Sequence, residues 1–177
     1  MKKLFNAVVV SVALGFAGLT GVASANPSPF GLTLEKTTVK EMQAKYKATR
    51  KGVNLYSNGP MFDLNPQDLG VDGLKSALVI FDQNEKLVAV LTTLPKHRFD
   101  NLHEILRGMY SVESSQIPFV GNKRVVMRNG NTRITLDAPH LSFDMEMNYI
   151  TDSFQRTFEA ALRREEEEKR KREAGNL

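Results

Sequence analysis

The feature that most constrains the fold is a hairpin whose strands carry apolar side chains on both faces. The sequence LKSALVIFDQNEKLVAVLTTL, residues 74–94, contains two β-rich runs separated by the polar turn DQNE. Neighbours in a strand point to opposite faces, and the neighbours Val79 and Ile80 are both apolar. Because such a strand needs cover on both faces, we expect this hairpin at the centre of an antiparallel sheet.

A second hairpin is predicted in RVVMRNGNTRITLD, residues 124–137. An Asn-Gly pair between β-rich runs is a strong signal for a two-residue turn, which puts the loop at Asn129 and Gly130. That loop sets Arg128 opposite Asn131. One face then carries Val125, Met127, Thr132, Ile134 and Leu136, and the other carries Arg124, Val126, Arg128, Arg133 and Thr135.

The stretch PHLSFDMEMNY, residues 139–149, alternates between apolar and polar residues and predicts another strand. Its apolar face carries Leu141, Phe143, Met145, Met147 and Tyr149, which we expect to face a core. Its polar face carries His140, Ser142, Asp144, Glu146 and Asn148.

Helices are predicted before, between and after these strands. Thr38 and Glu41 have the spacing of a capping box, which predicts a helix start. After Pro95 an apolar stripe at helical spacing predicts a second helix: Phe99, Leu102, Ile105, Leu106 and Met109. We therefore predict an α+β fold. It has an antiparallel sheet of about six strands in two helix-plus-three-strand units, helices packed on one face, and a charged C-terminal helical extension.

Both ends of the chain have a distinct composition. Residues 1–25 combine Lys2 and Lys3, an apolar run, and the small-residue sequence ASA before Asn26, which predicts a cleaved signal peptide. No second long apolar stretch follows, so we expect no stable membrane span after cleavage. We predict a single α+β domain over residues 26–162 and a charged tail, helical or disordered, over 163–177.

The composition excludes several classes of site. The chain has no cysteine, which excludes disulfides, a thiol nucleophile and thiolate metal ligands. The formal net charge of +4 gives no argument for nucleic-acid binding. The histidines, His97, His103 and His140, lack the spacing of a helical ligand pair, and the glycines form no phosphate-binding loop. We expect no metal and no cofactor.

His140, Ser142 and Asp144 are the residue types of a hydrolytic triad. On a strand, residues two apart lie about 7 Å from each other, whereas a nucleophile and its base need a direct hydrogen bond. No Gly-x-Ser-x-Gly sequence is present. We therefore predict that the protein is not an enzyme, and keep a hydrolase of unknown class as an alternative.

Binding to another macromolecule is the remaining reading. If the predicted strands are adjacent, their polar faces bring arginines and carboxylates together across strands. The predicted contact residues are Arg124, Arg128, Arg133, Asp144 and Glu146. The sequence QIPFVGNKRV places Ile117, Phe119 and Val120 between Pro and Gly. We expect these three in the core, with a partly exposed contact surface as the alternative.

The layout of helix-plus-meander units in a small exported protein resembles two families. One is the secreted β-lactamase inhibitory proteins, which repeat such units in tandem and clamp an enzyme with one sheet face. The other is the small outer-membrane assembly lipoproteins, which carry one unit. The resemblance assigns no site residue, because this chain lacks the lipoprotein cysteine and the disulfide cysteines.

The expected function is protein binding in the bacterial envelope, as an inhibitor, an immunity protein or an assembly-accessory factor. The expected location is the periplasm, with the extracellular space as the alternative. A periplasmic carrier of a small molecule or lipid, using space between the second helix and the sheet, is the main competing function. The oligomeric state is left open.

Overall fold

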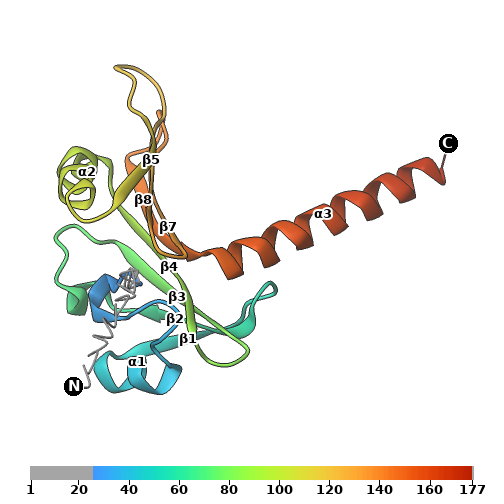
Figure 1. The fold of residues 1–177 in the computed structure, drawn as a ribbon, viewed down its shortest axis with the longest axis horizontal. Helices are drawn as coiled ribbons and strands as arrows, with labels where there is room; N and C mark the ends of the chain where they lie inside the picture. The colour runs from blue at the N-terminus through green and yellow to red at the C-terminus, as the bar shows by residue number, and fades with distance from the viewer. Residues whose placement is uncertain (1–25, 177) are drawn as a thin grey trace, which may run out of the picture.

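A computed structural model of the chain describes residues 26–176, and the predicted signal peptide lies outside these residues. The described part contains an antiparallel sheet of eight strands and three α-helices, which confirms the α+β class (Figure 1). The helices are α1 (Val39–Lys45), α2 (Phe99–Arg107) and α3 (Asp152–Ala174). The strands are β1 (Ala48–Val53), β2 (Asn58–Leu64), β3 (Ser76–Asp82), β4 (Leu87–Pro95), β5 (Ser111–Gln116), β6 (Lys123–Asn129), β7 (Thr132–Ala138) and β8 (Asp144–Thr151).

The sheet is built from two units, each a helix followed by a four-strand meander. Its strand order is β1-β2-β3-β4-β8-β7-β6-β5, so the last strands of the two units pair at the centre. The predicted total of about six strands, three per unit, is wrong. The prediction missed the edge strands β1 and β5, which are almost wholly exposed and therefore show no apolar alternation.

The doubly apolar hairpin of β3 and β4 lies inside the sheet, as predicted. Phe81 and Leu94 belong to the main core, whereas Ile80 and Val88 belong to a smaller cluster that includes Phe154 of α3. The main core also takes side chains from both short helices: Val39 and Met42 of α1, and Phe99, Leu102 and Leu106 of α2.

The helix ends follow from local hydrogen bonds. Thr38 Oγ1 accepts a bond from Glu41 N at 3.2 Å and Glu41 Oε2 accepts one from Thr38 N at 2.7 Å, which confirms the capping box. Thr151 caps α3 through one bond, in which its Oγ1 accepts from Phe154 N at 3.3 Å. That helix has no buried residue and extends away from the sheet (Figure 1), so the predicted tail is helical as far as Ala174.

Two predicted strand boundaries need correction. The β6–β7 turn is Gly130 and Asn131, and Arg128 lies opposite Arg133 rather than Asn131. Gly130 has φ of 54°, as a turn with a left-handed first residue requires. The residues predicted for each face of the hairpin still share that face, because the observed pairing differs from the predicted one by two residues and an even shift keeps side chains on the same face.

The strand predicted from His140 begins only at Asp144. Residues 139–142 form a turn in which Ser142 N donates to Pro139 O at 3.3 Å. Met145, Met147 and Tyr149 are buried, as predicted, but Leu141 and Phe143 are exposed. The predicted alternation of core-facing and solvent-facing side chains is therefore wrong for residues 140–143, because the chain turns there before β8 starts.

Candidate binding surface

Two loops leave the second unit side by side. Residues 117–122 connect β5 to β6, and residues 139–143 connect β7 to β8. Lys123 at the start of β6 pairs with Ala138 at the end of β7, so both loops emerge at the same end of the sheet (Figure 1).

These loops carry large apolar side chains in solvent. Phe119 is 104% exposed, Leu141 is 94% exposed and Phe143 is 93% exposed, with Val120 also mostly exposed. We call these four residues the loop-tip patch. The expectation that Ile117, Phe119 and Val120 belong to the core is wrong, since Ile117 is exposed as well. Isolated exposed apolar residues are ordinary, but a group of them in neighbouring loops is a candidate contact surface.

Hydrogen bonds hold the two loops in place. His140 N donates to Asn122 Oδ1 at 2.7 Å, which joins one loop to the other. Lys96, between β4 and α2, donates from its backbone N to Phe143 O at 2.8 Å and from Nζ to His140 O at 2.9 Å. The backbone around Leu141 and Phe143 is therefore held in place, which lowers the entropy that these two residues lose on binding.

The predicted contact residues Arg124 and Asp144 lie at the strand ends next to the loops. Arg124 Nη1 bonds Asp137 Oδ2 at 2.9 Å, and Asp144 pairs with Lys75. The predicted pairing of Asp144 with the arginines of β6 and β7 is therefore not formed. It fails because β6 is separated from β8 by β7, and because Arg133 of β7 lies opposite Ile150, at the other end of β8 from Asp144.

Arg128 is held between two carboxylates. Its Nη1 bonds the Asp152 carboxylate at 2.8 and 3.0 Å, and its Nε bonds Glu113, which sits at a bulge in β5. The hydrogen bonds to Glu113 and then to Asp152 raise the pKa of Arg128. This arginine connects β6 to β5 and to the first turn of α3.

The other two predicted residues take no part in these ion pairs. Arg133 is opposite Arg128, and its Nε is buried without a hydrogen-bond partner. Glu146 is exposed and accepts a bond from Asn148 Nδ2 at 3.1 Å. The structure thus spreads the five predicted residues over the second unit and does not gather them into one cluster.

The chain matches no known protein family, no curated protein and no solved structure.

The triad residue types are not assembled into a triad. Ser142 Oγ accepts a hydrogen bond from Asp144 N at 2.9 Å, and His140 uses its backbone N to join the loops. Over residues 26–176, no three His, Asp or Glu side chains are grouped as metal ligands would be. No helix in the same range combines the length and hydropathy that crossing a membrane requires.

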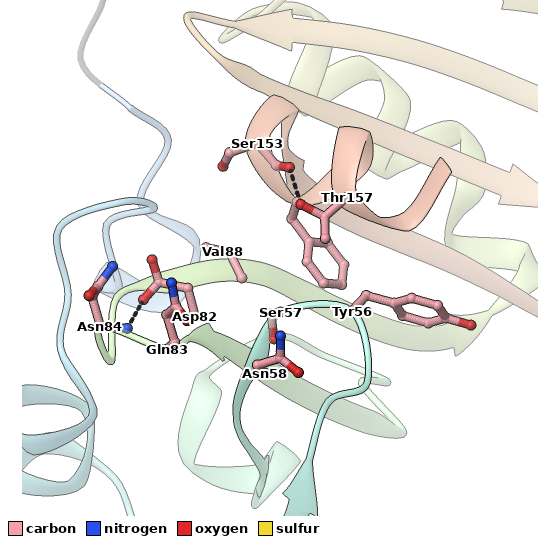
Figure 2. Close-up of a pocket in the computed structure, with 10 residues that line it drawn as sticks. Tyr56, Ser57, Asn58, Asp82, Gln83, Asn84, Val88, Ser153 and Thr157 are labelled. Atoms are coloured by element: carbon pink, nitrogen blue, oxygen red, sulfur yellow. Dashed lines mark hydrogen bonds between the residues drawn. The ribbon is translucent and has the colours of Figure 1, made fainter. Parts of the chain in front are cut away.

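A polar hollow of about 240 Å³ lies between the β1–β2 loop, the β3–β4 loop and the start of α3 (Figure 2). Its polar groups are largely used to hold these loops. Asp82 Oδ1 accepts bonds from the backbone N of Asn84 and Lys86 at 2.9 and 2.8 Å, and Thr157 Oγ1 donates to Ser153 O at 3.0 Å. The hollow is therefore explained by loop structure.

The sequence held one signal for the loop-tip patch, the Pro and Gly that bound the segment around Phe119. It held none for Leu141 and Phe143, because their spacing continues the alternation of β8. Such a pattern cannot distinguish two more strand residues from a turn that exposes them.

Proposed function

We propose that the protein is exported to the periplasm and binds another envelope protein there without catalysing a reaction. Inhibitor, immunity protein and assembly-accessory factor are the roles that this covers. The observation that carries the proposal is the loop-tip patch, in which Phe119, Leu141 and Phe143 are almost fully exposed on ordered loops. Large apolar side chains of this kind act as anchors that fill pockets on a partner.

A protein partner fits the charges beside the patch better than a lipid surface does. Stable attachment of a peripheral protein to a membrane needs a second signal besides apolar insertion, commonly a cluster of unpaired basic residues. Here three of the neighbouring cations are neutralised within the chain, and the ammonium of a fourth, Lys96, is engaged by the carbonyl oxygens of Pro139 and His140. Lys123 bonds Asp100 at 3.0 Å, Arg124 bonds Asp137 at 2.9 Å, and Lys75 pairs with Asp144.

In this proposal α1 and α2 cover one face of the sheet and leave the other face open beside the patch. Support comes from the alternation along β6 and β8. Val125 and Met145 join the core that contains both helices, whereas their neighbours Arg124 and Glu146 point the other way. Arg124 and Glu146 then form a polar rim next to the apolar anchors, the arrangement typical of protein interfaces.

The test is crosslinking in cells, followed by reconstitution with the purified partner. A Phe119→Ser, Phe143→Ser double variant should lose binding. Burial of each phenylalanine contributes roughly 1.5–3 kcal/mol, so the dissociation constant should rise by about a hundredfold or more. Leu55→Ser is the matched control, since Leu55 is also exposed but lies in the first unit, in the β1–β2 loop. Its affinity should equal that of the wild type.

Equal binding by the double variant and the wild type would rule out the loop-tip patch as the interface. Vesicles of phosphatidylethanolamine and phosphatidylglycerol test the lipid alternative. If the wild type sediments with these vesicles and the double variant does not, the patch binds a membrane and the proposal fails.

A further inference from the structure

An apolar groove lies between α2 and the N-terminal segment around Phe30. Phe30 and Val71 form one wall, α2 forms the other, and Met147 and Tyr149 of β8 lie at the base. We call it the α2 groove. Its volume of about 500 Å³ lies within the roughly 300–1,000 Å³ of sites that bury small ligands.

The wall formed by α2 is more apolar than folding requires. Leu102 and Leu106 are buried in the core, but Ile105 is 50% exposed and Met109, just after the helix, is 62% exposed. Ile105 and Met109 line the groove, where they present apolar surface to a space open to solvent.

The facing wall is fixed in position. Phe30 has a left-handed backbone with φ of 56°, which is uncommon for a residue other than glycine. Its carbonyl oxygen accepts bonds from Tyr46 Oη at 2.7 Å and Lys45 Nζ at 2.9 Å. A groove held open by such bonds needs little rearrangement to accept a ligand.

The two charged side chains that line the groove are paired with each other. Arg98 Nη1 bonds Asp72 Oδ2 at 3.1 Å, so the net charge of the lining is zero. At the base, the rings of Tyr110 and Tyr149 meet edge to face with centroids 6.2 Å apart, and Tyr149 Oη donates to Met147 Sδ at 4.0 Å. Burial raises the pKa of both phenols, which keeps them neutral.

These properties disfavour a peptide as the occupant. An extended peptide has backbone N–H and C=O groups that need partners, and the charged side chains of the lining, Arg98 and Asp72, are already paired with each other. A helical peptide satisfies its own backbone but is about 10 Å across, so 500 Å³ holds roughly one turn of it. Recognition of a helix in a groove uses anchors spread over at least two turns.

We infer that the α2 groove binds the hydrocarbon chain of an aliphatic ligand of the fatty-acyl type, with its polar end at the solvent-facing mouth. Such a chain needs no hydrogen bonds and no charge partner, which matches a largely apolar lining whose two charged side chains neutralise each other. The flexible side chains of Ile105 and Met109 would pack along it. This site is independent of the loop-tip patch, which lies in the loops beyond β5–β8.

The test is a titration of the purified protein with dansyl-labelled undecanoic acid. The chain contains no tryptophan, so the probe fluorescence is free of background from that residue. We expect saturable one-to-one binding and displacement by palmitate. Ile105→Glu and Met109→Glu should each weaken binding by about tenfold or more, because the groove would then desolvate a carboxylate. Both positions are half exposed or more, so the melting temperature should stay unchanged.

Val112→Glu is the matched control, since Val112 is similarly exposed on β5, outside the groove. It should bind the probe as the wild type does. A wild type that does not bind would overturn the inference, as would equal binding by the two groove variants and the control. Displacement of the probe by a Leu- and Met-rich helical peptide, with no displacement by palmitate, would also overturn it.

Discussion

Replacing Arg128 with methionine should destabilise the fold more than any other loss of a single surface ion pair in the second unit. Methionine keeps an unbranched apolar stem of similar length, so the change removes mainly the guanidinium. The structure makes this guanidinium the link between β6, Glu113 in the edge strand and Asp152 at the start of α3. Its loss leaves both carboxylates without their cation.

The magnitude follows from how exposed the three side chains are. Hydrogen bonds to charged groups contribute roughly 1.5–3 kcal/mol each when they are well shielded, and exposed ion pairs contribute roughly 0.2–1 kcal/mol. The Arg128 side chain is 29% exposed and its partners slightly more, which lies between these limits. We expect a loss of about 1–2 kcal/mol in the free energy of unfolding. For a chain of this size that lowers the melting temperature by about 2–8 °C.

Arg124→Met supplies the matched control on the same strand and the same face. Arg124 forms one ion pair, with Asp137, and its side chain is more than half exposed. We expect a loss of at most about 0.5 kcal/mol. Differential scanning calorimetry of the two variants makes the comparison. The argument that the two ion pairs of Arg128 stabilise the fold would be refuted by equal melting temperatures for Arg128→Met and the wild type. Equal losses for both variants would refute it as well.

Three further outcomes test other parts of the fold. Thr38→Ala removes the cap of α1 and should lower the free energy of unfolding by about 1 kcal/mol, measured by urea denaturation. Burial raises the pKa of Tyr149, so its contribution to stability is complete below the ordinary phenol value and declines as pH rises above about 10. Between pH 9 and 11, the free energy of unfolding of Tyr149→Phe should therefore fall by on the order of 1 kcal/mol less than that of the wild type. Identical curves of unfolding free energy against pH would contradict this. A chain that ends at Leu162 should melt at the wild-type temperature, since the removed residues are exposed; a large drop would show that they support the domain.

Sequence patterns located the parts of the fold where burial is alternate or periodic. The central hairpin, the faces of β6 and β7, and the capping box of α1 were all predictable, because each produces a repeated pattern or a paired spacing. Edge strands produce neither. Residues 48–53 and 111–116 are exposed on both faces, so no hydrophobic period marks them, and their backbone pairing depends on neighbours far away in the sequence.

The candidate site was less predictable than the fold, because it depends on which charged side chains form ion pairs with one another. Arg128 has the same residue type and face as Arg124, yet one holds three elements together and the other makes a single exposed pair. The difference depends on which carboxylates lie within reach. Glu113 belongs to a strand that the sequence does not reveal, so its contact with Arg128 could not be foreseen.

Apolar residues that continue a buried pattern but are themselves exposed lie in two places, and a contact with another molecule is proposed at each. Leu141 and Phe143 extend the period of β8 but stand on a turn, and Ile105 and Met109 extend the stripe of α2 but face a groove. In each case the apolar pattern continues beyond the surface that the fold can bury. An exposed apolar side chain adds little to the stability of the fold, so folding alone does not explain why these residues are apolar. Departures from the usual burial of apolar residues occur mostly at functional sites. Polar substitution at either place should therefore leave stability unchanged and remove a binding activity, and each place should lose a different one.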